Sequence, residues 1–275
     1  MPSTKPKIYL PSETKEQRRA RKRLEKGQSE QVQETVPVES SFKKNYIACL
    51  KWGNKYSSDY VNKLEQMVKR NCTINYEFIC FTENKNGLNE NIKTFNLPKL
   101  KADGWWYKPM FLGNDLPIKG TLLFLDLDVI VYQNIDKLFS YEPNKFVICR
   151  DFNRSIRQKW DRMNSSVFRV PIGKYDDLWK TFQKNTQNEI QRNRGDQDWM
   201  FRNIKDHKFW PDEWIMSYKW EMRDRRDLKI DAQTRKRNFT IDAPPKLHKD
   251  TSIAVFHGDP NPSDANDSWV KKHWG

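Results

Sequence analysis

Two aspartates, Asp126 and Asp128, stand one residue apart at the end of a strongly apolar stretch, over which we predict a strand, Thr121–Leu127. Because side chains alternate along a strand, both carboxylates would point the same way and repel each other unless a cation lay between them. Carboxylates and phosphate oxygens are the ligands that Mg²⁺ and Mn²⁺ prefer. The spacing therefore favours a divalent-metal site over a solvated strand end.

A histidine near the carboxyl end of the chain is a candidate third ligand. His257 and Gly258 follow a short predicted strand, Ile253–Phe256. An imidazole there can bind a metal ion, and a glycine lets the backbone come close to an anion. A lone histidine is more often an ordinary hydrogen-bonded residue, so this signal has weight only together with the two aspartates.

The hydrophobic pattern places these residues in an α/β domain. A strand is predicted at Asn45–Lys51, and an amphipathic helix begins at Ser57 or Ser58. Further strands are predicted at 76–82, 92–97, 146–149 and 166–170, further helices at 105–112, 175–182 and 196–204, and a surface loop at 223–238. Alternating strands and helices indicate a largely parallel sheet, whose carboxyl edge is the usual ligand-binding edge.

Composition separates a basic arm, residues 1–42, from the domain, residues 43–275. Among its 275 residues the chain has 50 Lys and Arg against 36 Asp and Glu, a formal net charge of +14. Nine Lys and Arg lie between Lys5 and Lys26, against three Glu, without an apolar stripe. We expect residues 1–42 to be disordered or loosely helical, and residues 5–26 to make electrostatic contact with a membrane, nucleic acid or protein as the alternative to a solvated arm.

The cysteines and the apolar runs indicate the cellular compartment in which the protein is expected. Cys49, Cys72, Cys80 and Cys149 are widely spaced without a C-x-x-C pair, which favours buried free thiols and a reducing compartment. No apolar run is long enough to cross a membrane. We therefore expect a cytoplasmic protein, with peripheral membrane contact as the open alternative.

Six motifs in fixed order, covering roughly residues 45–262, carry a family resemblance. They are K-W-G-N-K-Y at 51–56, W-W-Y-K at 105–108, L-D-L-D at 125–128, N-S-S-V at 164–167, G-D-Q-D-W at 195–199 and H-G-D-P at 257–260. The series resembles GT-A-fold glycosyltransferases, close to a poorly characterised bacterial family and more distantly the glycogenin-type family 8 enzymes. The resemblance implies a GT-A (Rossmann-like) mixed, mostly parallel sheet flanked by helices.

The resemblance also implies roles for particular residues. Asp126, Asp128 and His257 match the metal ligands, and Asp126 also matches a ribose contact. The residues that match nucleotide-binding and sugar-binding positions are Lys51, Trp52, Tyr56, Asn164, Ser165 and Gly258. Lys108 matches a lysine that faces the donor, and Asp196 and Gln197 match a pair beside the anomeric carbon. Trp105, Trp106 and Trp199 fit the core as well as a sugar platform.

The implied activity is metal-dependent transfer of a hexose from a nucleotide sugar, first of all a UDP-sugar, to an acceptor hydroxyl with retention, the cofactor being Mn²⁺ or Mg²⁺. In an inverting enzyme Asp196 or Asp198 would be the candidate base. The acceptor is unknown, and the positive charge leans toward an acidic one. A sugar nucleotidyltransferase, and a nucleic-acid-binding or assembly protein on a transferase scaffold, are the alternatives.

One departure bears on donor binding. Relatives usually read H-G-x-P-[KR]-P followed by an aromatic residue, whereas this chain has Asn261 and Ser263 at the basic and aromatic positions. The basic residue would contact the donor diphosphate. Lys271 and Lys272 are the candidates to replace it.

Overall fold

The computed structural model describes residues 14–16, 18–19, 44–157, 159–226, 229–234, 237–238 and 241–275. The chain divides after Phe42 into two units. In the first unit the described residues Lys15, Glu16, Arg18 and Arg19 are helical. The rest of residues 1–42, with most of the expected basic arm at residues 5–26, lies outside the described residues.

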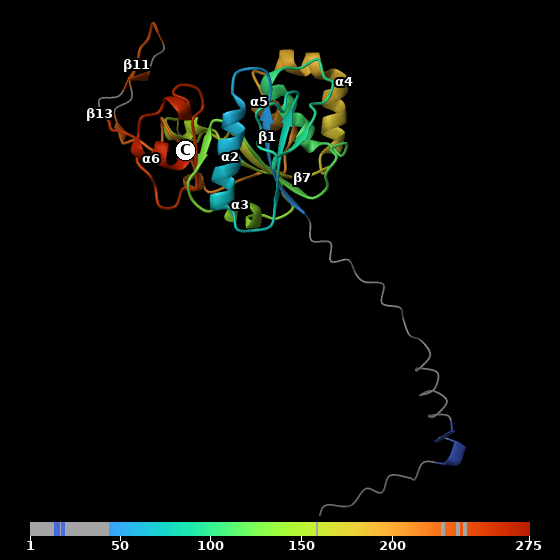
Figure 1. The fold of residues 1–275 in the computed structure, drawn as a ribbon. Coiled ribbons are helices and arrows are strands. Elements are labelled where there is room, and N and C mark those ends of the chain that lie inside the picture. The colour runs from blue at the N-terminus through green and yellow to red at the C-terminus, as the bar shows by residue number, and fades with distance from the viewer. Residues whose placement is uncertain are drawn as a thin grey trace, which may run out of the picture. The chain divides into compact units, whose positions relative to one another are not determined.

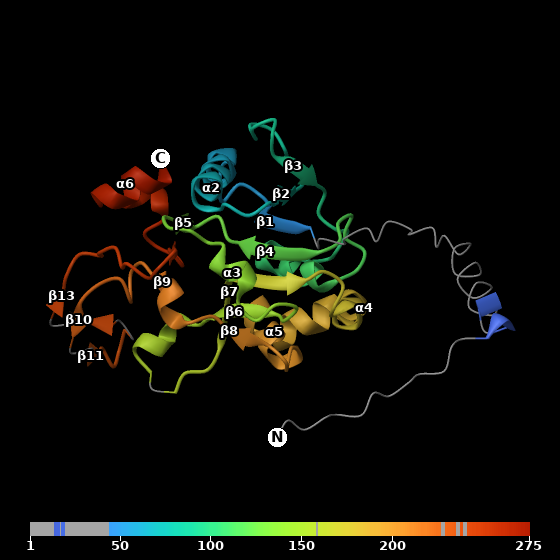
Figure 2. The same cartoon turned by 90° about the horizontal axis from the view of Figure 1, so that it is seen from below.

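The second unit is built on a seven-stranded sheet (Figures 1 and 2). Its strands lie in the order β3 (Lys93–Phe95), β2 (Glu77–Thr82), β1 (Asn45–Lys51), β4 (Thr121–Leu125), β7 (Met163–Pro171), β6 (Val147–Arg150) and β8 (Lys208–Phe209). Only β7 runs against the others, because it pairs antiparallel with both β4 and β6. The predicted mixed, mostly parallel α/β sheet is confirmed.

Alternation along the strands produces a core on each face of the sheet. In β1, Ile47 and Cys49 pack on one face, with α2 (Ser58–Asn71), while Tyr46, Ala48 and Leu50 pack on the other. That second face is covered by η1 (Gly104–Leu112), α4 (Asp176–Arg192) and α5 (Asp196–Asn203). Strands buried on both faces read as continuous apolar runs, which is why β1, β2 and β4 were predictable.

A smaller sheet adjoins the first core. β14 (Ile253–Val255) lies between β5 (Val129–Val131), with which it is antiparallel, and β9 (Ile215–Ser217), with which it is parallel. The C-terminal helix α6 (Ser268–Trp274) contacts α2 (Figure 1). This sheet brings the segment after β4 beside the segment after β14.

Several sequence expectations need correction. The strand predicted to Leu127 ends at Leu125, and α4 extends to Arg192 with a break in helical geometry at Asn185. Residues 223–238 contain short strands rather than a loop alone: β10 (Arg225–Arg226), β11 (Lys229–Ile230) and β12 (Arg237–Asn238), followed by β13 (Ile241–Asp242). The remaining short elements are α3 (Lys137–Ser140), η2 (Phe152–Ser155), η3 (Asp212–Trp214) and η4 (Pro262–Asp264). Helix α6 was not predicted.

The four cysteines are buried and free, as expected. Among the described residues, no helix is both long and apolar enough to span a bilayer.

A buried arginine ties β7 to the end of α3. Arg169 is 1% exposed, and its Nη1 donates to the carbonyls of Leu138 at 2.8 Å, Phe139 at 2.7 Å and Tyr141 at 2.6 Å. These carbonyls belong to a helix terminus that has no intrahelical donors left. Burial lowers the pKa of Arg169 to about 10, so the guanidinium stays charged at neutral pH.

We expect Arg169→Met to lower the free energy of unfolding by about 3 kcal/mol, because it leaves buried carbonyls without donors. Chemical denaturation measures the change. The exposed Arg192→Met on α4 is the matched control and should stay within about 0.5 kcal/mol of the wild type. Equal losses in the two variants would show that Arg169 has no special role.

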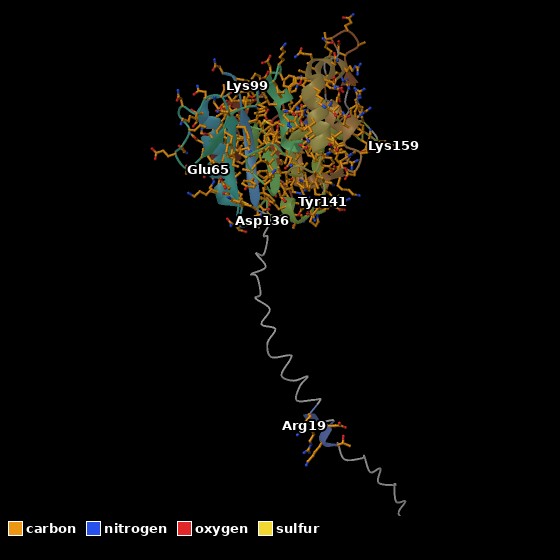
Figure 3. The ribbon with its side chains drawn as sticks, turned by 90° about the vertical axis from the view of Figure 1, so that its right-hand side faces the viewer. Arg19, Glu65, Lys99, Asp136, Tyr141 and Lys159 are labelled. Atoms are coloured by element: carbon orange, nitrogen blue, oxygen red, sulfur yellow. The ribbon has the colours of Figure 1, made fainter. Side chains whose placement is uncertain are left out.

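Asp136, at the lower edge of the domain in Figure 3, holds the residues that follow α2. Its carboxylate accepts hydrogen bonds from the Thr73 amide at 2.9 Å, from the Thr73 hydroxyl and from Asn134 Nδ2 at 3.1 Å. Burial opposes ionisation of this carboxyl, but the hydrogen bonds outweigh it and lower its pKa to about 2. The folded state therefore favours the ionised form.

Asp136→Asn should lower the free energy of unfolding at pH 7 by about 1 kcal/mol, a value reduced for solvent access. A lowered pKa stabilises the fold above the unfolded pKa, near 4, and this stabilisation is lost as the pH falls toward 2. Denaturation curves between pH 7 and pH 2 should show the wild type and the variant converging. A difference that stayed constant with pH would contradict the assignment.

Candidate active site

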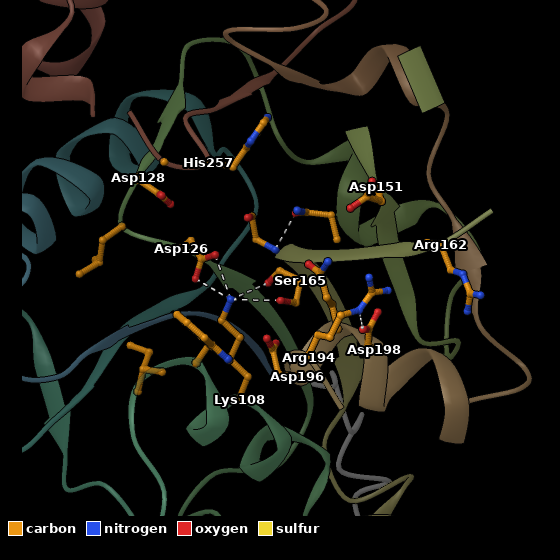
Figure 4. Close-up of a pocket in the computed structure, with 18 of the residues that line it drawn as sticks. Lys108, Asp126, Asp128, Asp151, Arg162, Ser165, Arg194, Asp196, Asp198 and His257 are labelled. Atoms are coloured by element: carbon orange, nitrogen blue, oxygen red, sulfur yellow. Dashed lines mark hydrogen bonds and ion pairs between the residues drawn. The ribbon is translucent and has the colours of Figure 1, made fainter. Parts of the chain in front are cut away.

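A cavity of about 440 Å³ opens at the carboxyl edge of the main sheet. Trp52, Asp126 and Asp151 each follow one of the parallel strands β1, β4 and β6, and all three line it. Because β7 runs the opposite way, its first residues, Asn164 and Ser165, reach the same edge. Figure 4 shows Asp126, Asp151 and Ser165 around this cavity. The topology thus gathers residues from distant parts of the sequence, as in other open α/β sheets.

Lys108 lies at the centre of the hydrogen bonding. Its side chain is buried, and Nζ lies 2.8 Å from Asp126 Oδ1 and 2.9 Å from Asp126 Oδ2. Nζ also donates to Ser165 O at 3.1 Å and Ser165 Oγ at 3.3 Å. Burial disfavours the ammonium, but the charges of Asp126 and Asp196 outweigh this and raise the pKa of Lys108. It therefore remains a cation inside the protein.

The backbone geometry of η1 explains why the Lys108 side chain points into the cavity. The 3₁₀ helix η1 begins at Gly104, whose φ of 62° favours glycine. A Cβ at that position would lie 2.8 Å from the Trp52 ring, so the glycine also lets η1 pack against the loop after β1. Pro109 is accommodated in this tight helix, which turns Lys108 inward.

Asp126 and Asp128 lie in the turn between β4 and β5, so strand alternation does not orient them as predicted. Backbone bonds fix the turn: Asp126 N donates to Ser166 O at 2.8 Å, and the Phe256 amide donates to Asp128 O at 2.9 Å. Tyr56 donates its hydroxyl to Asp128 Oδ2 at 3.2 Å. Burial, and then the charge of Asp126, raise the pKa of Asp128. The pair is thus a site of excess negative charge.

His257 comes near the pair through the register of the small sheet, in which Val255 lies opposite Val129. Its ring faces another way, however: Nε2 lies 2.6 Å from Ser217 Oγ, and the ring stacks on Phe152 with 5.1 Å between centroids. Nowhere in the described part of the chain do three or more His, Cys, Asp or Glu side chains form a group able to hold a metal ion. The three predicted ligands therefore share one cavity without forming a preassembled site.

The charges of the cavity bear on whether a metal ion fits. Its lining includes five carboxylates and four cationic side chains, namely Asp126, Asp128, Asp151, Asp196 and Asp198 with Lys55, Lys108, Arg162 and Arg194. An anionic diphosphate entering this lining needs further positive charge. Mg²⁺ is commonly held by one or two carboxylates plus substrate phosphates. Asp126 and Asp128 fit that donor set, whereas His257 in this orientation does not add to it.

Asp196 and Gln197 begin α5 and line the cavity. The sequence pattern predicts Asp196 as the cap of this helix, and this prediction is wrong, because the N-cap is Gly195 and Asp196 is the first helical residue. Asp196 is 4% exposed, and its Oδ2 accepts no hydrogen bond from any residue that the structure describes. Burial raises its pKa, although Lys108 opposes the change.

Other candidates are placed apart from the cavity. Lys51 is buried at the end of β1 and is not among the lining residues, and Lys271 and Lys272 are exposed on α6. Asn261 caps η4 in a reciprocal pair of bonds with Asp264. By contrast Trp52, Tyr56 and Gly258 do line the cavity.

Sequence reasoning missed part of the lining: Asp151, Asn153, Trp160, Arg162 and Arg194. One signal was available, because Asp151 comes shortly after the predicted strand 146–149, at the end of an apolar run. Of the three tryptophans left open, Trp106 and Trp199 are buried, while Trp105 is half exposed and lines the cavity.

Comparisons with known proteins place the chain by fold. No family model matches it, and no curated protein matches its sequence. Among solved structures, the apo form of the glycosyltransferase GlyE from Streptococcus pneumoniae TIGR4 aligns with a TM-score of 0.54 and 11% identity, over 84% of this chain and 59% of that one. The apo bifunctional glycosyltransferase WbbM aligns with a TM-score of 0.50 and 12% identity, over 85% and 51%. The chain spans half to three fifths of their length and has the fold of these glycosyltransferases.

Proposed function

We propose that this protein transfers a hexose from a nucleotide sugar, with a UDP-sugar as the first candidate, to an acceptor hydroxyl. The observation that carries the proposal is the carboxylate pair Asp126 and Asp128, which follows β4 and shares one cavity with Asp196 and Gln197. The likeness in fold to glycosyltransferases supports it.

Different residues would bind different parts of the donor. A Mn²⁺ or Mg²⁺ ion held by Asp126 and Asp128 would neutralise charge on the departing diphosphate. Lys108 fixes the Asp126 carboxylate through two bonds, and Tyr56 fixes Asp128 through one. Trp52 lines the cavity and would offer an aromatic surface for the base. Preorganised charge of this kind is usually the largest catalytic contribution.

Asp196 and Gln197 would act on the sugar ring of the donor, at the carbon whose bond to the diphosphate breaks. A buried carboxylate whose Oδ2 has no donor among the described residues is free to stabilise positive charge on the sugar ring as its bond to the diphosphate breaks. This role agrees with retention, which the family resemblance implies. NMR of the anomeric proton in the product distinguishes retention from inversion.

A panel of nucleotide sugars with Mn²⁺, scored for release of the nucleoside diphosphate, tests the proposal. We expect release with at least one donor, and a rate lower by about 10²–10³ in Asp128→Asn, because a metal ligand that supplies a few kcal/mol is lost. Chelation of the metal should have a similar effect.

Asp59→Asn is the matched control, since this aspartate is exposed on α2 outside the cavity. Its rate should equal that of the wild type. Release that persisted unchanged in Asp128→Asn, or in the presence of chelator, would remove the metal from the mechanism. Absence of release with every donor would count against the transferase proposal itself.

A second variant tests the buried ion pair. Lys108→Met leaves Asp126 and Asp196 without their shared cation, and we expect the free energy of unfolding to fall by about 3–5 kcal/mol. Adding Asp126→Asn should restore part of the loss, because it removes one uncompensated charge. Chemical denaturation of the two single variants and the double variant measures the coupling.

Lys93→Met is the comparison for Lys108→Met, because Lys93 pairs with Glu77 at the surface. Surface pairs contribute about 0–1 kcal/mol, so little change is expected. Additive effects of the Lys108 and Asp126 substitutions would refute the coupling.

A further inference from the structure

The cavity has a second half, distinct from the metal-binding end. In Figure 4, Asp151, Arg194 and Asp198 lie on the side away from Asp128. None of the three was assigned to the donor. All three line the same cavity as Asp196, and Arg194 and Asp198 lie close to it in Figure 4. The group that receives the hexose must reach the same cavity.

An exposed indole lies next to this half. Trp105 is 50% exposed, and in the described part of the chain only Trp105 and Leu247 are large hydrophobic residues with such exposure. A Cβ built on Gly195 would lie 3.7 Å from Trp105 Nε1, so the indole lies beside the backbone that joins Arg194 to Asp196. A half-exposed indole offers apolar surface with negative potential on its ring faces, which suits the C–H face of a pyranose ring.

The polar groups in this half of the cavity are balanced in charge. Arg194 Nε donates to Asp198 Oδ2 at 2.9 Å, so these two largely cancel. Asp151 Oδ1 accepts from Trp160 Nε1 at 2.8 Å and from the Asn153 amide at 2.9 Å, which holds its carboxylate in place. Carboxylates accept and guanidinium groups donate, and a sugar hydroxyl can do both.

This balance bears on the charge of the acceptor. The net charge of +14 belongs to the whole chain, whereas the cavity carries more carboxylates than cations. An anionic acceptor would meet Asp151 and Asp198 as well as Arg162 and Arg194. A neutral, hydroxyl-rich molecule satisfies both kinds of group without leaving a charge uncompensated.

We propose that the acceptor is a neutral saccharide whose terminal ring packs on Trp105 and whose hydroxyls bind Asp151, Arg194 and Asp198. The inference rests on the proposed transferase function, and it names the substrate class of the same site. It replaces the acidic acceptor suggested by the overall charge.

Saturation-transfer NMR with the full chain tests the proposal without requiring turnover. The probes are the methyl β-glycosides of glucose, galactose and N-acetylglucosamine, compared with methyl β-glucuronide and glucose 6-phosphate. We expect binding of at least one neutral glycoside, with the strongest transfer to the protons on one face of the ring, and weaker binding of both anionic probes.

Variants localise the binding. Trp105→Ala should weaken it at least tenfold, and Trp105→Phe should recover part of the affinity because it keeps an aromatic face. Leu247→Ala removes the other exposed large side chain, outside the cavity, and should leave saccharide binding unchanged. A loss with Leu247→Ala equal to that with Trp105→Ala would overturn the site.

Separate titrations distinguish this inference from the proposed function. Titration with UDP and Mn²⁺ reports on the donor end alone, so failure there with intact glycoside binding counts against the transferase and not against the saccharide site. Preferential binding of the glucuronide or the phosphate, or affinity unaffected by Trp105→Ala, would overturn the neutral saccharide acceptor while the donor proposal stood.

Discussion

The arrangement of the cavity depends on one buried cation. The Lys108 ammonium joins η1 to the turn after β4 through Asp126 and to β7 through Ser165, and the charge of Asp196 at the start of α5 acts on it. An ammonium group removed from water is tolerated only when oxygen atoms surround it. Any arrangement that kept Lys108 buried therefore had to bring these elements together. Those same elements carry the residues proposed for the metal, the sugar and the reaction centre. A change that disturbs the ion pair would therefore also disturb the geometry of the site.

Charge is distributed unevenly between the chain and its cavity. The sequence as a whole is strongly basic, yet the cavity lining carries five carboxylates against four cations. For a diphosphate this excess of acid is unfavourable, and the metal ion proposed at Asp126 and Asp128 would supply the missing positive charge. For a neutral sugar, paired donors and acceptors such as Arg194 and Asp198 are sufficient. The two halves of the cavity thus suit different ligands, in agreement with the two substrates of the proposed transferase.

The elements that could be predicted from the sequence are those that a local hydrophobic pattern determines. Apolar runs located β1, β2 and β4 because strands buried on both faces leave an unbroken signal. The limits of β7 and α4 were missed for different reasons. β7 begins at Met163, before the predicted strand, and includes Asn164 and Ser165, polar residues that tertiary contacts bury. Beyond residue 182, α4 continues through polar residues that are mostly exposed, so no apolar stripe marks this part of the helix. Asp151 was overlooked although it follows a strand as Asp126 does, because only the sheet order shows that both strands end at one edge. Side chains recruited from loops, such as Trp160, gave no periodic signal at all.

For His257, the order of the motifs predicts the position of the backbone but not the orientation of the side chain. The order of the motifs predicts that its backbone lies beside Asp128, and the pairing of Val255 with Val129 places it there. The direction of the ring is decided by other contacts: Ser217 Oγ bonds Nε2, and Phe152 stacks on the imidazole. Neither partner is near His257 in sequence. A short motif can indicate the path of the backbone, but the rotamer of a side chain depends on the groups that pack around it. The chemistry of a histidine depends in turn on which ring nitrogen faces the ligand. For that reason the two aspartates are the stronger candidates in the proposed metal site, and the histidine would have to exchange Ser217 for the ion before joining them.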